Sequence, residues 1–364
     1  MKPKLPRCGI APSRFEAPPE DFLNLLSSFM WMNRRATACT AKPVLLAFRV
    51  RRNREVDEVR IVLIGQAAFA EKALEALHSR GEEIVHVFAP PDAPGGRPDP
   101  LKTKALELGL PLSQPASFRG EREFDHFRSL DADLAVMAFV TIIVPERILY
   151  APRFKTICFH PSLLPRHRGA SAINWAIIQG DAETGVTWFW PDRGIDTGPI
   201  LIQRRVPIGP ADTTGSLYFN TLFPLGIETM LEAVDLIGAG KAPATPQDES
   251  LATYEAPCRD EHAAIDFSQP TRTVYNLVRG CDPQPGAFAT FGGRRLHLYD
   301  ALLEAGATGA APGTIVGIDR EGMKIALDGA SMLVRRARFD PSPKKIAPAE
   351  LAAANEIAAG VRLG

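Results

Sequence analysis

The fold of this chain is decided by the stretch VRIVLIG at residues 59–65. Its apolar, largely β-branched residues run up to a glycine, which is typical of a buried strand that ends in a tight turn. From Phe69 to His78, apolar side chains then recur at helical spacing. A strand, a glycine turn and a helix in this order begin a parallel sheet that helices cover.

The same alternation continues along the chain to about residue 238. It predicts an α/β fold: a Rossmann-like, open, mostly parallel sheet with helices on both faces, formed by a domain at residues 59–238. The further strands are expected at 84–89, 134–138, 156–160, 185–190 and 200–206, and the helices at 101–108, at 145–149, and from the capping cluster Asp212-Thr213-Thr214 to about 238.

A smaller second domain is expected to follow. Residues 239–254 are rich in proline and small polar residues, which predicts a linker. Residues 255–345 contain one expected helix, at 271–279, and then short strand-like pieces separated by glycine and proline, the pattern of a small β-barrel. The two ends are expected to be a poorly ordered N-terminal extension at 1–58 and a C-terminal tail at 346–364.

Composition narrows the class of protein. The 364 residues include 42 Lys plus Arg and 42 Asp plus Glu, so the formal net charge is zero and gives no global attraction to DNA or to a membrane surface. The five cysteines form no CxxC pair and lie beside no histidine cluster with metal-ligand spacing. No apolar run reaches the roughly 18 residues of a membrane span. We therefore expect a reduced, metal-free, cytoplasmic protein.

Polar residues just after the strands are the candidates for chemistry, because ligands of open parallel sheets bind beyond the carboxyl ends of the strands. Gly65-Gln66 lacks the GxGxxG pattern of dinucleotide sites and predicts only a tight turn. His160 opens the loop HPSLLPRHRG at 160–169, whose prolines give the rigidity that a catalytic group needs. We expect His167 and the arginines beside it to be loop scaffold or surface residues.

A second candidate loop is DRGIDTG at 192–198. Taken alone, this pattern of aspartate and glycine is more typical of a turn than of a site. A carboxylate that reaches a histidine would nonetheless form a simple acid-base pair, because it orients the ring and favours its charged form.

Three longer runs carry a family resemblance. HPSLLPRHRGASAINW at 160–175, GDAETGVT at 180–187 and DRGIDTGPIL at 192–201 resemble the formyltransferase family that uses 10-formyltetrahydrofolate. The similarity covers roughly residues 59–340, including YNLVRGCDPQPGA at 275–287. Within the family it is greatest to the N-terminal hydrolase domain of 10-formyltetrahydrofolate dehydrogenase, and it extends to methionyl-tRNA formyltransferase.

The resemblance implies a formyl donor and roles for individual residues. The donor would be 10-formyltetrahydrofolate, and no metal would be needed. His160 matches the catalytic histidine, which would stabilise the oxyanion formed at the formyl oxygen, and Asp196 matches the catalytic aspartate, which would hold the ring and accept a proton from the nucleophile. A loop that wraps the pterin ring is matched by Met137, Ala138, Phe139, Val140, Thr141, Ile142, Ile143 and Val144, and the scaffold of the catalytic loop by Ser162, Leu163, Leu164, Pro165, Arg168 and Gly169.

One position departs from the family pattern. Most transferases of the family carry an asparagine two residues before the histidine as a second oxyanion donor, and this chain has Cys158 there. A thiol is a poor donor, and the hydrolase domain also lacks the asparagine, so the departure fits the hydrolase branch. The favoured role of Cys158 is that of a small buried filler.

The formyl acceptor is therefore expected to be water or a small nucleophile. Residues 255–345 contain 12 Lys plus Arg against 11 Asp plus Glu, and the segment 90–101 has Arg97 as its one basic residue, which disfavours tRNA as a partner. Methionyl-tRNA formyltransferase remains the main alternative. Further alternatives are a sugar-amine formyltransferase and a non-catalytic folate-binding protein, against which the retained His160 and Asp196 argue.

Overall fold

Strand β1 (Arg60–Gly65) lies inside a seven-stranded sheet of the order β3-β2-β1-β4-β5-β7-β8. The computed structural model describes residues 59–364, so the extension predicted at 1–58 lies outside the described residues. The first five strands of this order pair in parallel, whereas β7 runs antiparallel to β5 and β8 antiparallel to β7. This confirms the mostly parallel sheet. Its other strands are β2 (Glu83–Phe88), β3 (Leu112–Ser113), β4 (Leu134–Ala138), β5 (Thr156–His160), β7 (Glu183–Phe189) and β8 (Ile200–Pro207).

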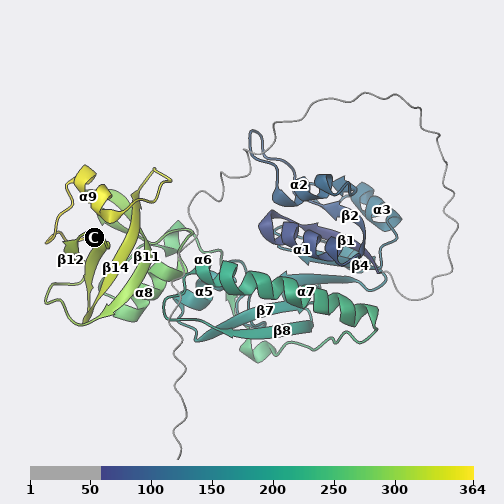
Figure 1. Ribbon diagram of the computed structural model, residues 1–364. Coiled ribbons are helices and arrows are strands. Elements are labelled where there is room, and N and C mark those ends of the chain that lie inside the picture. The colour runs from purple at the N-terminus through teal and green to yellow at the C-terminus, as the bar shows by residue number, and fades with distance from the viewer. Residues whose placement is uncertain (1–58) are drawn as a thin grey trace, which may run out of the picture. The chain divides into compact units, whose positions relative to one another are not determined.

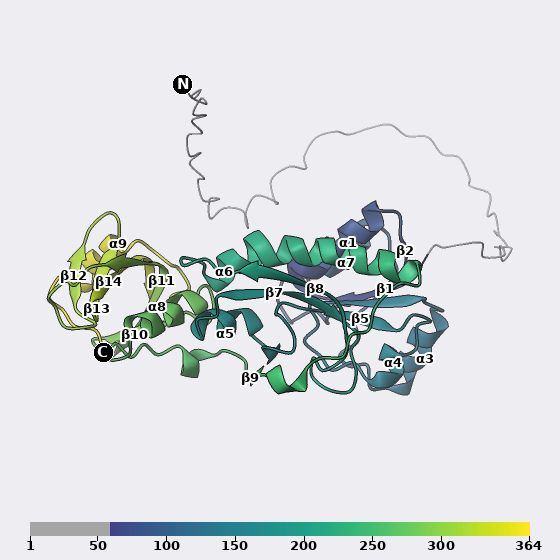
Figure 2. The ribbon, with the colours of Figure 1, turned by 90° about the horizontal axis from the view of Figure 1, so that it is seen from below.

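Helices cover both faces of this sheet, as Figure 2 shows for α1 and α7 on one side and α3 and α4 on the other. The alternation along β1 explains the two layers, because successive side chains of a strand point to opposite faces. Ile61 and Leu63 pack with α1 and α7, whereas Val62 and Ile64 pack with α3 and α4. The helices are α1 (Ala67–Ser79), α2 (Pro100–Glu107), α3 (Glu121–Ser129), α4 (Glu146–Leu149), α5 (Ala172–Ile178) and α7 (Phe223–Gly238).

The helix predicted from the cluster at 212–214 begins where expected and contains an unexpected turn. Thr213 caps α6 (Thr214–Leu217), and its side chain accepts from the amide of Ser216 while the Ser216 hydroxyl accepts from the amide of Thr213. A π-helical turn at Tyr218–Leu222 then leads into α7. Pro224 in the first turn of α7 has no amide hydrogen, so the regular ladder of helical hydrogen bonds cannot pass through it.

The second domain is a curved antiparallel sheet of the order β10-β11-β14-β13-β12, which confirms the barrel-like prediction as a half-barrel with two edge strands (Figures 1 and 2). The predicted tail at 346–364 instead closes the core of this domain, because Leu351, Ile357 and Leu363 are buried against the sheet. The elements are α8 (Thr271–Gly280), β10 (Phe288–Phe291), β11 (Arg294–Ala305), β12 (Ile315–Ile318), β13 (Met323–Leu327), β14 (Ala330–Phe339) and α9 (Pro348–Asn355).

No helix within residues 59–364 combines the length and the apolar character that crossing a bilayer requires.

A buried histidine lies near the edge of the main sheet. His86 on β2 is 5% exposed, and its Nε2 lies 2.9 Å from the hydroxyl of Ser113. Burial, together with the smaller effect of the neighbouring His126, lowers the pKa of His86 to about 4. The folded protein therefore holds His86 in its neutral form at neutral pH.

Acid is expected to destabilise the fold through His86. The unfolded chain binds a proton near the ordinary pKa of 6.5, whereas the folded protein does so only near 4, so stability is complete above 6.5 and is lost as the pH falls toward 4. The loss is at most about 3 kcal/mol. Urea unfolding across this pH range should show a shallower pH dependence for His86→Gln than for wild type, with the exposed His78→Gln as control. Equal slopes in wild type and His86→Gln would contradict the assignment.

Candidate active site

Strand β5 ends at His160, whose side chain is buried at the carboxyl edge of the sheet. Its Nε2 donates to the backbone carbonyl oxygen of His167 over 2.7 Å. Its Nδ1 faces Oδ2 of Asp196 at 3.5 Å. Because the carbonyl can only accept, Nε2 carries a proton and Nδ1 is the nitrogen directed at the carboxylate. The structure thus brings together the two residues that the sequence singled out.

Asp196 is held by hydrogen bonds to both its carboxylate and its backbone carbonyl. The residue adopts a left-handed conformation with φ 56°, which aspartate tolerates better than most residues. Its Oδ2 accepts from the amide of Gly169 over 2.8 Å, and its carbonyl accepts from the side chain of Gln247 over 2.8 Å. Within the described residues, Oδ1 has no hydrogen-bond partner, so one oxygen is free to accept a proton from a nucleophile.

The loop at 160–169 is tied to the sheet by several hydrogen bonds. The hydroxyl of Ser162 donates to the carbonyl of Arg166 over 2.7 Å, and the carbonyl of Ser162 accepts from Thr187 over 2.7 Å. The side chain of Gln203 donates to the carbonyl of Leu164 over 2.9 Å. The first of these bonds lies within the loop, and the other two join the loop to β7 and β8.

Arg168 is not a surface residue, although the arginines of this loop were expected to be scaffold or surface. Its side chain is 0% exposed, and its guanidinium donates to Gln247, to Glu249 and to the hydroxyl of Tyr254. The bonds to Glu249 raise the pKa of Arg168 above its usual range. Gln247 also donates to the carbonyls of Asp196 and Gly198, so Arg168 braces the loop of Asp196 through one intervening side chain.

The segment predicted as a linker therefore contributes to the site. Residues 239–254 supply Gln247 and Glu249, and Thr245 exchanges two backbone hydrogen bonds with Ile200 at the start of β8. Two short strands complete the arrangement: β6 (Arg168–Gly169) pairs in parallel with β9 (Tyr254–Glu255). Composition alone gives no signal for these contacts.

Cys158 lies on the same face of β5 as His160, because the two residues are two positions apart on a strand. The thiol is half-buried and makes one weak hydrogen bond, 3.7 Å to the carbonyl of Phe159. Burial raises the pKa of Cys158 well above its usual range, and the charge of Asp196 raises it further. Cys158 therefore stays protonated, which supports the role of a filler over that of a nucleophile.

An apolar cavity opens at the carboxyl ends of β1, β2 and β4. Of the eight residues predicted to contact the pterin ring, Val140 and Ile142 line it, whereas Met137, Ala138 and Val144 are buried in the cores and Ile143 is 70% exposed. Sequence reasoning missed the remaining wall, although Pro90 and Pro91 after β2, and Pro115 and Phe118 after β3, are visible in the sequence as apolar residues. That wall consists of Ile64, Gly65, Gln66, Phe88, Ala89, Pro90, Pro91, Pro115, Ala116 and Phe118.

Gly65 in this wall is required by close packing. A Cβ atom there would lie 2.4 Å from the carbonyl oxygen of Ala138 and 2.6 Å from the Cβ of Ala70. Beside it, the Gln66 side chain accepts from the hydroxyl of Thr141 over 3.2 Å and so joins the turn after β1 to the predicted pterin loop. The turn predicted at Gly65-Gln66 is therefore also part of the cavity.

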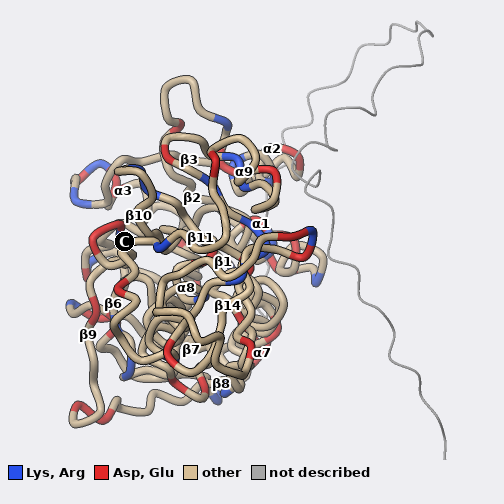
Figure 3. The backbone as a smooth tube through the Cα atoms, turned by 90° about the vertical axis from the view of Figure 1, so that its left-hand side faces the viewer, with Lys and Arg blue, Asp and Glu red and all other residues tan. Residues whose placement is uncertain are grey.

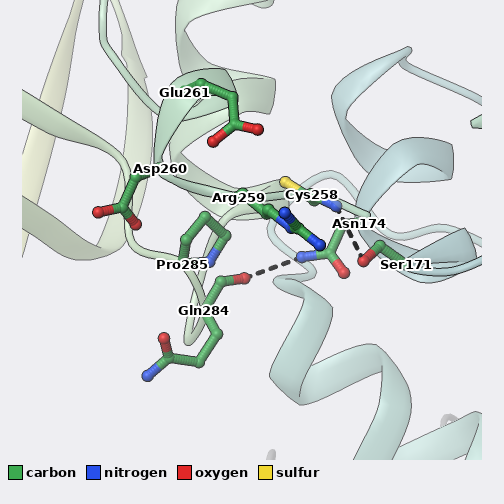
Figure 4. A pocket seen from close by; sticks show the side chains of 8 residues that line it. All are labelled: Ser171, Asn174, Cys258, Arg259, Asp260, Glu261, Gln284 and Pro285. Atoms are coloured by element: carbon green, nitrogen blue, oxygen red, sulfur yellow. Dashed lines mark hydrogen bonds between the residues drawn. The ribbon is translucent and has the colours of Figure 1, made fainter. Parts of the chain in front are cut away.

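A larger, polar pocket of about 520 Å³ lies between α5 and the chain at 258–261 (Figure 4). The side chain of Asn174 donates to the carbonyl of Gln284 over 2.9 Å, and the hydroxyl of Ser171 accepts from the amide of Cys258 over 3.0 Å. Charged side chains of Arg259, Asp260 and Glu261 surround the opening in Figure 4. None of these residues was singled out from the sequence.

Residues 59–364 contain no group of three or more His, Cys, Asp or Glu side chains arranged to hold a metal ion.

Comparison with known proteins identifies the family. Residues 59–234 match the model of the formyl transferase domain, and residues 258–355 match that of the formyl transferase C-terminal domain. Methionyl-tRNA formyltransferase of Geotalea uraniireducens (strain Rf4) is 38% identical over 311 residues, which cover 84% of this chain and 98% of that protein. The chain belongs to the formyltransferase family.

One further relative and one solved structure are also similar to this chain. Mitochondrial 10-formyltetrahydrofolate dehydrogenase of Mus musculus is 39% identical over 297 residues, or 78% of this chain. The match spans only 32% of the length of that relative. The crystal structure of HypX from Aquifex aeolicus in complex with tetrahydrofolic acid shares the fold, with a TM-score of 0.61 and 21% identity over 81% of this chain and 47% of that one.

Proposed function

We propose that this formyltransferase-family protein cleaves the formyl group of 10-formyltetrahydrofolate and passes it to water or a small nucleophile. With water, the products are formate and tetrahydrofolate. The observation that carries the proposal is the half-buried, protonated thiol of Cys158 on the face of β5 that also bears His160, where most transferases of the family place an asparagine.

The geometry supports separate roles for His160 and Asp196. Water attacks the formyl carbon, and negative charge develops on the formyl oxygen. A protonated His160 presents Nδ1–H to that oxygen as well as to the carboxylate of Asp196, because Nε2–H is already donated to the carbonyl of His167. Oδ1 of Asp196 accepts the proton that leaves the attacking water, since Oδ2 is bound to the amide of Gly169. The C–N bond to the folate then breaks, the folate nitrogen takes this proton from Asp196, and the formic acid released loses its own proton to solvent.

The folate would bind in the apolar cavity at the strand ends. Its apolar lining, which includes Phe88, Phe118 and Val140, suits a heterocycle, and the backbone of the neighbouring loop at 139–143 would offer donors and acceptors for the ring edge. Methionyl-tRNA formyltransferase is the second candidate, because a relative of that name matches this chain over 98% of its own length, both domains included.

The proposal is tested by supplying 10-formyltetrahydrofolate alone and measuring formate and tetrahydrofolate. We expect the two products in equal amounts, with no amine present. Cys158→Asn adds an oxyanion donor and is expected to raise turnover by up to about a hundredfold, whereas the control Cys158→Ala adds no donor and should change turnover little. If folate binds but neither formate nor any formylated product forms, the protein is a folate-binding protein without catalysis and the proposal is wrong.

A further inference from the structure

We propose that His167 is a positioning residue for the catalytic pair. Its buried ring is held between two carboxylates, and its backbone carbonyl sets the orientation of His160. The proposal rests on the proposed formyl-transfer chemistry at His160 and Asp196. It concerns a residue that the sequence placed among scaffold or surface side chains.

The ring of His167 is buried between two carboxylates. The residue is 2% exposed, its Nε2 lies 2.9 Å from Oδ2 of Asp181, and its Nδ1 lies 3.2 Å from Oε1 of Glu255. The contact with Glu255 lacks the alignment of a hydrogen bond. Arg166 donates to the other oxygen of Asp181 over 2.8 Å, and Gln179 donates to Glu255 over 3.3 Å.

The imidazole of His167 and the guanidinium of Arg166 lie beside the carboxylates of Asp181 and Glu255, whose side chains are only 14% and 10% exposed. Removing the imidazole would leave these buried carboxylates without one of their polar neighbours. The ring is therefore held between two carboxylates.

The backbone of His167 is held in a conformation that directs its carbonyl at the catalytic ring. The residue has φ 56°, in the left-handed region that side chains with a Cβ disfavour. Its amide donates to the hydroxyl of Thr253 over 2.8 Å, and its carbonyl accepts from Nε2 of His160 over 2.7 Å. This last bond selects the ring orientation that turns Nδ1 of His160 toward Asp196.

The ring of His167 is also connected to Asp196 through Glu255 and Gly169. Glu255 pairs with Gly169 across the short β6–β9 ladder, and the amide of Gly169 donates to Oδ2 of Asp196. The ring thus stabilises the neighbours of both catalytic groups. Within the described residues it is not part of the apolar cavity wall, so it is expected to influence turnover rather than folate affinity.

The test compares His167→Gln with a matched control, His297→Gln, using the full chain. His297 is 1% exposed, its Nδ1 donates to the carbonyl of Gly286 over 2.9 Å, and its Nε2 lies 3.0 Å from Asp340 in the second domain. Both variants are expected to melt at lower temperatures than wild type. Only His167→Gln should lower kcat, by about tenfold to a hundredfold, with KM for 10-formyltetrahydrofolate within about twofold of wild type.

A double-mutant cycle separates positioning from a purely structural role. In the Asp196→Asn background, His167→Gln should reduce the residual turnover by a smaller factor than in wild type, because one of the two groups it positions is already disabled. Should His167→Gln fail to fold, Glu255→Gln keeps the shape of the partner, removes one charge, and is expected to lower kcat several-fold with KM unchanged.

Two results would overturn the proposal. One is a folded His167→Gln or Glu255→Gln enzyme with wild-type kcat. The other is a loss of kcat in His167→Gln that His297→Gln reproduces. If Asp196→Asn itself retains full turnover, the catalytic assignment under the proposed function fails as well, and the two failures are thereby told apart.

Discussion

Replacing Asp196 with asparagine is expected to lower kcat by about a thousandfold, which corresponds to roughly 4 kcal/mol of transition-state stabilisation. The amide has nearly the shape of the carboxylate, and its oxygen can still accept from Gly169, so the loop should stay in place. It cannot accept the proton of the attacking nucleophile. Replacing His160 with asparagine should cost a similar factor, because no cation then faces the developing oxyanion.

Turnover and thermal melts should be measured together on the same preparations. Asp192→Asn is the matched control, since Asp192 lies in the same loop and its carboxylate accepts from the amide of Gly194 over 2.9 Å and from the hydroxyl of Thr197 over 2.5 Å. We expect the control to keep most of the activity. Near wild-type activity in both Asp196→Asn and His160→Asn would show that the site has been assigned to the wrong residues.

Formate release is expected to exceed formyl transfer to methionyl-tRNA by at least about tenfold, and to respond little to salt. A complex with 6–10 phosphate contacts would lose about 10³–10⁵ in affinity between 50 and 200 mM salt, whereas attack by neutral water on a bound folate involves no comparable release of counterions. Both reactions should be followed with the same enzyme over this salt range.

The charges of the second domain are the physical reason for this expectation. Several of its basic side chains already lie beside acidic partners: Arg295 pairs with Asp260, Lys324 with Glu304, and Arg338 with Asp340. In Figure 3 the Lys and Arg segments are spread among Asp and Glu segments over several elements. Faster transfer to methionyl-tRNA than to water, with a steep fall as salt rises, would favour the tRNA enzyme instead.

Much of the fold was predictable because it depends on local patterns. The run at 59–65 has the composition of a buried strand, and the apolar period that follows is that of a helix, so the α/β layering follows from short stretches of chain. The capping cluster at 212–214 likewise identified the start of a helix. The placement of His160 at a strand end also came from this reasoning, because parallel strands present their carboxyl ends on one edge.

Asp196 could be paired with His160 only through the family resemblance, since a loop of aspartate and glycine is by itself a common turn. Their contact depends on a fold that brings residue 196 back over the end of β5. The predicted pterin loop also came only from the family resemblance. Of its eight predicted residues, Val140 and Ile142 line the cavity.

By itself, then, the sequence determined the layered sheet, the half-barrel and the histidine at the strand end, because each follows from periodicity over a few neighbouring residues. Only the tertiary structure decided that Arg168 and His167 are buried and that the predicted linker braces the site through Gln247. The hydrogen bond between Arg168 and Gln247 joins residues 79 positions apart. Whether such a polar side chain is buried with a hydrogen-bond partner or exposed to water depends on where distant segments pack. No pattern of neighbouring residues predicts this packing.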